Sequence, residues 1–140
     1  MENSIPIRCR LVACREKLCD GKKWSFYLVN DSNTSFDLAV LHTILYEWGD
    51  WGNSEAIDGR VKDVAPGAHA LIWRGDCDGA ELRMELMLYV RVGDYEMQLR
   101  FEFPKLYLIK QLQIVDALGK PGWQVSAEGC LMKAIAKRNL

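Results

Sequence analysis

The sequence predicts an all-β protein, an antiparallel β-sandwich of two packed sheets that forms a single domain over residues 1–140. Two runs of alternating apolar and polar residues flank a Gly-Asp pair at positions 93–94, which is typical of a long β-hairpin. Other strand-like segments recur about every 8–12 residues, with turn formers between them. Hydrophobic residues make up 49% and charged residues 26% of the chain, as in ordinary globular domains.

The hairpin is expected to comprise residues 81–92 and 95–103. Apolar side chains alternate with charged ones in both runs, so one face of the hairpin packs on a core and the other meets solvent. Pro104 cannot donate to a strand ladder and ends the second strand. The residues expected to face the core are Leu82, Met84, Leu86, Leu88, Leu99, Phe101 and Phe103.

Elements before the hairpin are less sharply defined. The segment 24–29 is aromatic and β-branched, and a run of turn formers follows it. Residues 36–48 mix the helical and strand periods, and the turn formers on both sides favour an extended conformation. Ala65-Pro66-Gly67 predicts a type II turn, and residues 69–73 then form a short strand.

The last third of the chain is ambiguous. Residues 107–114 fit either a helical turn or a strand, Gly119–Gly122 reads as a turn, and residues 123–127 look extended. The segment 130–138 fits either a final strand or one short helix near the C-terminus.

Charge and hydropathy exclude several function classes. Eighteen Lys and Arg residues against nineteen Asp and Glu residues give a net charge of −1, so no nucleic-acid partner is expected. No apolar run reaches the roughly 18 residues of a transmembrane segment. The first residues do not have the pattern of a signal peptide, which predicts a cytoplasmic protein, or one released without a signal peptide.

Five cysteines, an odd number, predict reduced thiols without disulfides. Cys9, Cys14 and Cys19 are evenly spaced, but a zinc site would need a second pair downstream, so no metal or other cofactor is expected. On a strand, Cys9 and Cys19 would point to one face and Cys14 to the other.

The sequence does not predict an enzyme. His42 and His69 lie in no catalytic motif, and neither a phosphate-binding loop nor a nucleophile elbow is present. Residues 76–79 resemble the opening of a calcium loop, but Met87 stands where that loop needs a glutamate. A histidine close to Cys77 would instead indicate a hidden active site.

Aromatic residues in the expected loops are the feature most suggestive of function. Tryptophan suits places where one end of the ring is buried and the other is wet, such as a lipid headgroup region or a protein interface. The alternative is that these rings cap the ends of the core. The candidate contact residues are Tyr46, Trp48, Asp50, Trp51, Trp73 and Trp123.

Over residues 26–104 the sequence resembles the aegerolysins, a family of small β-sandwich proteins. The resemblance lies in five short segments: Leu28-Val-Asn-Asp-Ser32, Trp48-Gly-Asp-Trp-Gly52, Val64-Ala-Pro-Gly67, Leu86-Met-Leu-Tyr89 and Leu99-Arg-Phe-Glu-Phe-Pro104. It implies a non-enzymatic protein that recognises membrane lipid through exposed aromatic side chains, as one component of a pore-forming toxin.

Two functions follow as expectations. The first is a binding module for membrane lipid or a membrane surface, with zwitterionic lipid favoured because the sequence shows no polybasic cluster. The second is a protein-interaction module, either an inhibitor-like or immunity-like partner or a homodimer. It would use the sheet edge or the polar face of the hairpin, where Met87 and Tyr89 could serve as anchors.

Overall fold

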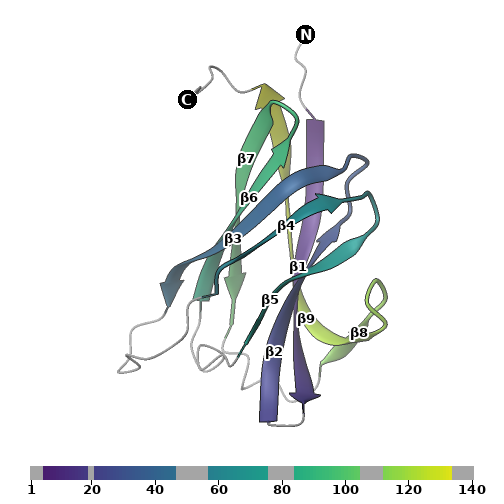
Figure 1. The fold of residues 1–140 in the computed structure, drawn as a ribbon, viewed down its shortest axis with the longest axis vertical. Helices are drawn as coiled ribbons and strands as arrows, with labels where there is room; N and C mark the ends of the chain where they lie inside the picture. The colour runs from purple at the N-terminus through teal and green to yellow at the C-terminus, as the bar shows by residue number, and fades with distance from the viewer. Residues whose placement is uncertain (1–4, 19–20, 47–56, 76–83, 105–111, 134–140) are drawn as a thin grey trace.

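The computed structural model describes residues 5–18, 21–46, 57–75, 84–104 and 112–133. This part of the chain folds into nine strands and contains no helix (Figure 1). The strands are β1 (Ile5–Leu18), β2 (Gly21–Asn30), β3 (Phe36–Tyr46), β4 (Gly59–Val64), β5 (His69–Gly75), β6 (Met84–Val92), β7 (Tyr95–Phe103), β8 (Gln113–Val115) and β9 (Lys120–Lys133).

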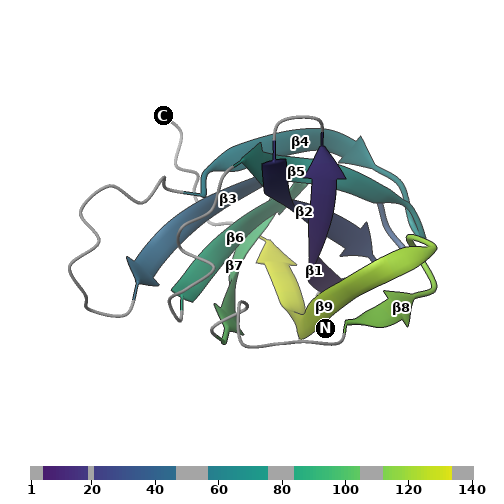
Figure 2. The same ribbon diagram turned by 90° about the horizontal axis from the view of Figure 1, so that it is seen from below.

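The strands form two antiparallel layers that face each other across one core, which confirms the predicted β-sandwich. One layer has the order β4-β3-β6-β7-β9 and the other β9-β1-β2-β5. Strand β9 belongs to both layers, because its last residues pair with β7 and its middle pairs with β1. Viewed from below, the layers curve around the core, and β8 lies outside them beside the start of β9 (Figure 2).

The predicted hairpin is confirmed as β6 and β7. Its turn lies at Gly93-Asp94, where Gly93 has a φ of 60°, a conformation that suits glycine. Six of the seven residues expected in its core are at most 5% exposed, and Leu82 lies outside the described residues.

Strand β3 confirms the extended reading of residues 36–46. Phe36, Ala39 and Leu41 are buried, so the alternation of buried and exposed side chains changes phase after Phe36. The neighbouring strand β4 is irregular opposite this point. Asp63 has a φ of 55° and lies between Lys62 and Val64, which pair with β3. Leu38 and Val40 therefore face away from the core, beside Lys62 and Arg60 of β4.

The C-terminal part of the chain differs from two expectations. The turn expected at Gly119–Gly122 occupies residues 116–119, where the amides of Leu118 and Gly119 donate to the carbonyl of Val115, and Lys120 already begins β9. Residues 130–133 continue β9 as a strand, so the helical alternative is wrong for them, and the remainder of that segment lies outside the described residues.

Apolar side chains gather in two clusters. The main core lies between the layers and includes Cys9. The second cluster lies on the outer face of β1 and β2, where Cys14 and Tyr27 pack beneath Val115 of β8. Cys9 and Cys14 thus point to opposite faces of β1, as the spacing predicted, and the β8–β9 hairpin covers part of an outer face.

A fully buried amide joins three segments at the upper end of the sandwich. The Asn30 side chain donates to the carbonyls of Thr34 and Val64, each at 2.9 Å, and accepts from the amide of Ser32. The amide of Gly67, in the confirmed Pro-Gly turn, donates to the Asn30 carbonyl. This network connects the end of β2, the loop before β3 and the β4–β5 turn.

Candidate functional site

The two ends of the sandwich differ in composition. At the upper end of Figure 1, the turns at residues 31–35, 65–68 and 93–94 contain no aromatic residue. At the lower end, the described strands carry a set of large rings that we call the aromatic end. It comprises Trp24, Phe26, Trp73, Phe103 and Trp123.

One row of paired residues forms the centre of the aromatic end. Trp73 of β5 pairs with Phe26 of β2, Phe26 pairs with Ala13 of β1, and Ala13 pairs with Trp123 of β9. The rings of Phe26 and Trp73 meet edge to face at a centroid distance of 5.9 Å, and Phe103 from the opposite layer packs edge to face on Phe26 at 5.3 Å. These contacts fix the row in place.

Trp123 is the partly open member of this row. Its position opposite Ala13 puts it on the core-facing side of β9, yet 37% of the residue is exposed. The pairing of β7 with β9 explains this exposure. The described residues of β7 pair with β9 only at Tyr95 and Glu96, so the two strands separate toward the level of Trp123.

Arg15 and Trp24 form the rim beyond this row. They pair across β1 and β2, and the Arg15 guanidinium lies 5.6 Å from the centre of the Trp24 ring. A cation over an indole face is attracted by the ring electrons. Arg15 is exposed, so this end presents a positive charge next to aromatic surface.

The pairing of β1 with β2 gathers further basic residues beside Arg15. Lys17 pairs with Lys22, and Glu16 pairs with Lys23, so the register of the two strands places three lysine positions at the end of the hairpin beyond Arg15 and Trp24. The expectation that the chain has no polybasic cluster stays a prediction, because the side chains of Glu16, Lys17, Lys22 and Lys23 lie outside the described part of the structure. The Asp20-Gly21 dipeptide is a common hairpin signal and could have indicated that β1 and β2 are neighbours, but it does not give the register that sets Lys17 opposite Lys22.

The predicted contact residues fall into three groups. Tyr46 is the last residue of β3 and pairs with Met84 at the same lower end, whereas Trp48, Asp50 and Trp51 lie outside the described residues. Trp73 is only 9% exposed and belongs to the main core, so the structure places it beneath the surface rather than in an exposed patch. Trp123 is exposed as expected.

The histidines do not form a catalytic group with any described nucleophile. His42 contacts the carboxylate of Asp58 at 3.1 Å on an outer face, and the His69 ring meets Tyr27 edge to face on the other layer. Burial raises the pKa of the Cys9 thiol to about 12, and Asp31 adds to this shift, so Cys9 stays protonated and unreactive. Cys77 lies outside the described residues.

Metal ligation and membrane crossing have no support in the described part of the chain. No three His, Cys, Asp or Glu side chains of the described residues are grouped as metal ligands. Nor do these residues form a helix with the length and hydrophobicity that would carry it across a membrane.

Comparisons of the chain with models of known families, with curated proteins and with solved structures give no match. The resemblance to the aegerolysins, with the toxin role it implies, therefore stays a prediction.

Proposed function

We propose that the chain is a non-enzymatic binding module that recognises a lipid membrane surface through the aromatic end. The observation that carries the proposal is the partly exposed Trp123, which lies in the same row as two buried rings. An indole held by a rigid sheet can enter the headgroup region without a large loss of conformational freedom.

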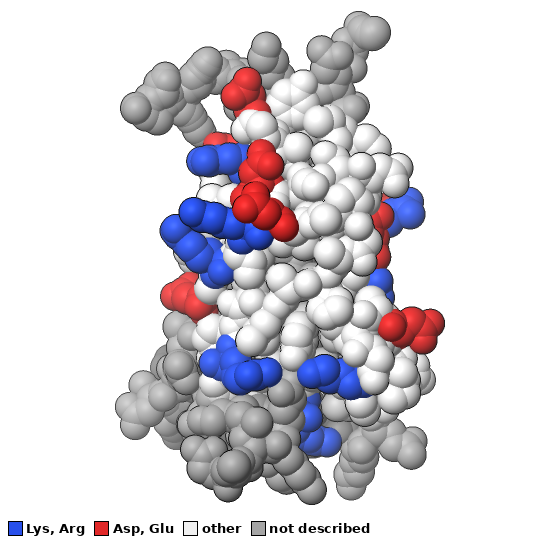
Figure 3. All heavy atoms as spheres, turned by 45° about the vertical axis from the view of Figure 1, so that its right-hand side comes forward, with Lys and Arg blue, Asp and Glu red and all other residues white. Residues whose placement is uncertain are grey.

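The basic residues of the β1–β2 hairpin add an electrostatic component to this proposal. Near an anionic membrane surface, each Lys or Arg contributes about 1 kcal/mol. On the face drawn in Figure 3, described Lys and Arg side chains lie beside Asp and Glu in the upper half, and others lie just above the grey atoms of the lower end, where fewer Asp and Glu side chains are seen. We therefore expect binding to anionic vesicles to be stronger than binding to zwitterionic ones, in contrast to the expectation from composition alone.

Vesicle sedimentation tests the proposal. Wild-type protein is mixed with vesicles of phosphatidylcholine, with or without phosphatidylserine, and the bound fraction is measured. Trp123→Ala should weaken binding to both vesicle types by about tenfold, since full burial of a large apolar side chain contributes about 1.5–3 kcal/mol. A Lys22→Glu, Lys23→Glu variant should weaken binding only where phosphatidylserine is present.

Leu71→Ala is the matched control, because Leu71 is 39% exposed but lies on β5 beside Tyr27, on an outer face of the sandwich. It should bind as the wild type does. Lack of wild-type binding to either vesicle type contradicts the proposal, and so does a Trp123→Ala variant that binds normally.

A further inference from the structure

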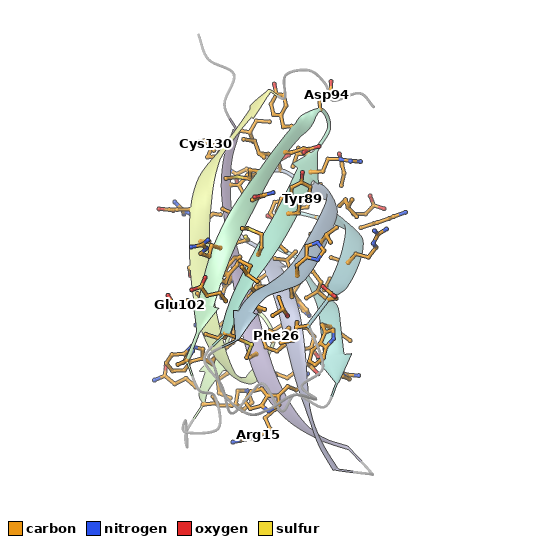
Figure 4. The ribbon with its side chains drawn as sticks, turned by 90° about the vertical axis from the view of Figure 1, so that its left-hand side faces the viewer. Arg15, Phe26, Tyr89, Asp94, Glu102 and Cys130 are labelled. Carbon is orange, nitrogen blue, oxygen red and sulfur yellow. The ribbon has the colours of Figure 1, made fainter. Side chains whose placement is uncertain are left out.

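The outer face of β4, β3, β6 and β7 carries a band of apolar side chains. We call this surface the β3–β6 face; Figure 4 looks onto it, with Tyr89 labelled. Val40 of β3 pairs with Tyr89 of β6, and Leu38 and Met87 lie in the neighbouring rows. All four side chains are half-buried, and the flanking strands β4 and β7 present charged residues.

The charges on the two flanks are opposite in each of two rows. In one row Lys62 of β4 and Glu96 of β7 lie at the two sides, with Leu38 and Arg91 between them. Two rows further along the strands, Asp58 next to β4 and Arg100 of β7 lie at the two sides.

The intervening row is uncharged on the β7 side. It runs from Arg60 through Val40 and Tyr89 to Gln98. From Asp58 to Lys62 the β4 flank thus changes from negative to positive, while from Arg100 to Glu96 the β7 flank changes from positive to negative.

This pattern makes the β3–β6 face complementary to itself. A two-fold axis that runs along the strands between β3 and β6 lays β4 of one copy over β7 of a second copy. Lys62 then faces Glu96 of the second copy, Asp58 faces Arg100, and Val40 faces Tyr89. Each contact occurs twice because of the symmetry. An axis perpendicular to the strands would instead lay β4 over β4 and β7 over β7. Lys62 would then face Asp58 and Glu96 would face Arg100, but Arg60 of the intervening row would face Arg60 of the second copy, and this like-charge contact disfavours that axis.

We propose that two copies of this chain associate through the β3–β6 face, with the two-fold axis along the strands. The geometry is that of aligned sheet packing, in which the strand directions of the two sheets differ by about 30°. The apolar band forms the centre of the interface and the charged flanks form its rim, as in other protein interfaces.

Lys62 makes no ion pair with a described residue of its own copy. Within one copy, Glu96 accepts a hydrogen bond from the Tyr89 hydroxyl, Asp58 contacts His42 and Arg100 contacts Glu85. Exposed pairs of this kind contribute little to stability, so exchanging them for contacts with a second copy costs little. This proposal goes beyond the lipid recognition proposed above and does not depend on it.

Charge reversal tests the interface and the direction of its axis together. In Lys62→Glu, two carboxylates face each other at both contacts, and in Glu96→Lys two ammonium groups do. Like charges facing each other across an interface cost several kcal/mol, so each variant should lose self-association by at least about tenfold. Mixed together, the two variants place opposite charges at both contacts and should form a heterodimer.

The masses are measured by light scattering after size exclusion, over a range of protein concentrations, and by native mass spectrometry of the mixture. Wild-type protein should reach twice the 16.0 kDa of one chain. Thermal melting checks that each variant is folded, and Glu128→Lys, on an exposed position of β9 paired with β1, serves as a charge-reversal control that should dimerise normally.

The proposal is overturned if wild-type protein stays monomeric at every concentration, or if either variant dimerises like the wild type. It is also overturned if both variants are monomeric but their mixture yields no heterodimer, because that result excludes the axis along the strands.

Discussion

Asn30 is fully buried, and both polar atoms of its side-chain amide have hydrogen-bond partners. Its amide satisfies the carbonyls of Thr34 and Val64 and accepts from Ser32. In the sequence, Asn30 belongs to a run of turn formers and to the first aegerolysin-like segment, and in the structure its hydrogen bonds stabilise one end of the sandwich.

Replacing Asn30 by alanine should lower the free energy of unfolding by about 3 kcal/mol, because two buried carbonyls and an amide lose their partner. Urea denaturation followed by circular dichroism measures this loss. Asn33→Ala, at an exposed position in the following loop, should change stability by less than about 0.5 kcal/mol. Equal effects of the two substitutions would contradict the role of the buried network.

Cys9 should resist alkylation in the folded protein, whereas the exposed Cys130 should react. Burial raises the folded-state pKa of Cys9 to about 12, and an unfolded thiol ionises near pH 8.5. The folded state therefore keeps a proton that the unfolded state loses, and the contribution of Cys9 to stability declines as the pH rises above about 8.5. Mass spectrometry after iodoacetamide treatment at pH 8 gives the rate at each cysteine, and similar rates at the two would contradict this assignment.

At the scale of elements, β4 and β5 approach each other closely at one glycine. β4 and β5 are the first and last strands in the strand order, and they meet at Gly59. A Cβ atom added at Gly59 would lie 1.9 Å from the backbone carbonyl oxygen of Ile72. Ile72 is itself the extra residue where the β2–β5 register shifts. Only glycine allows the two edges to come this close.

Gly59→Ala should therefore destabilise the protein by about 1–3 kcal/mol, since β4 and β5 have to move apart. Gly129→Ala is the matched comparison, because the added methyl meets the terminal methyl of Met97, a flexible side chain that can shift. Chemical denaturation should give a clearly smaller loss for Gly129→Ala. A larger loss of stability for Gly129→Ala than for Gly59→Ala would show that β4 and β5 can move apart at little cost in free energy.

Local alternation was enough to predict β6 and β7, because every second side chain of that hairpin packs on the same core, fully or partly buried. Long-range pairing could not be predicted in this way. The sequence shows no signal that β9 pairs with both β1 and β7, or that Lys17 comes to lie opposite Lys22 beside Trp24. These positions depend on which strands become neighbours, and the alternation of one strand carries no information about its partner.

The same reason limited the prediction of the binding residues. Both Trp73 and Trp123 lie next to turn formers in the sequence. Phe26, which itself packs on Phe103 of the opposite layer, covers the Trp73 ring, whereas the divergence of β7 from β9 exposes Trp123. Whether a tryptophan is buried depends on the opposite layer, which the sequence does not place.

At the scale of the whole molecule, β9 should make unfolding cooperative. It pairs with β1 in one layer and with β7 in the other, so neither layer can lose its order without exposing part of the shared core. Tryptophan fluorescence and far-ultraviolet circular dichroism should therefore give coincident transitions in urea. Two separated transitions would show that the layers unfold independently.

The ladder between β1 and β9 also determines how the sandwich responds to tension. Ile5 pairs with Leu131 at one end of this ladder and Ala13 pairs with Trp123 at the other, so the chain enters and leaves the described fold on neighbouring strands at the same end. A force pulling these two points apart acts across the strands and loads their hydrogen bonds one after another rather than all at once. The sandwich would unzip from Ile5 and Leu131 at low load, whatever its equilibrium stability, and the row that contains Trp123 would be the last part of the ladder to separate.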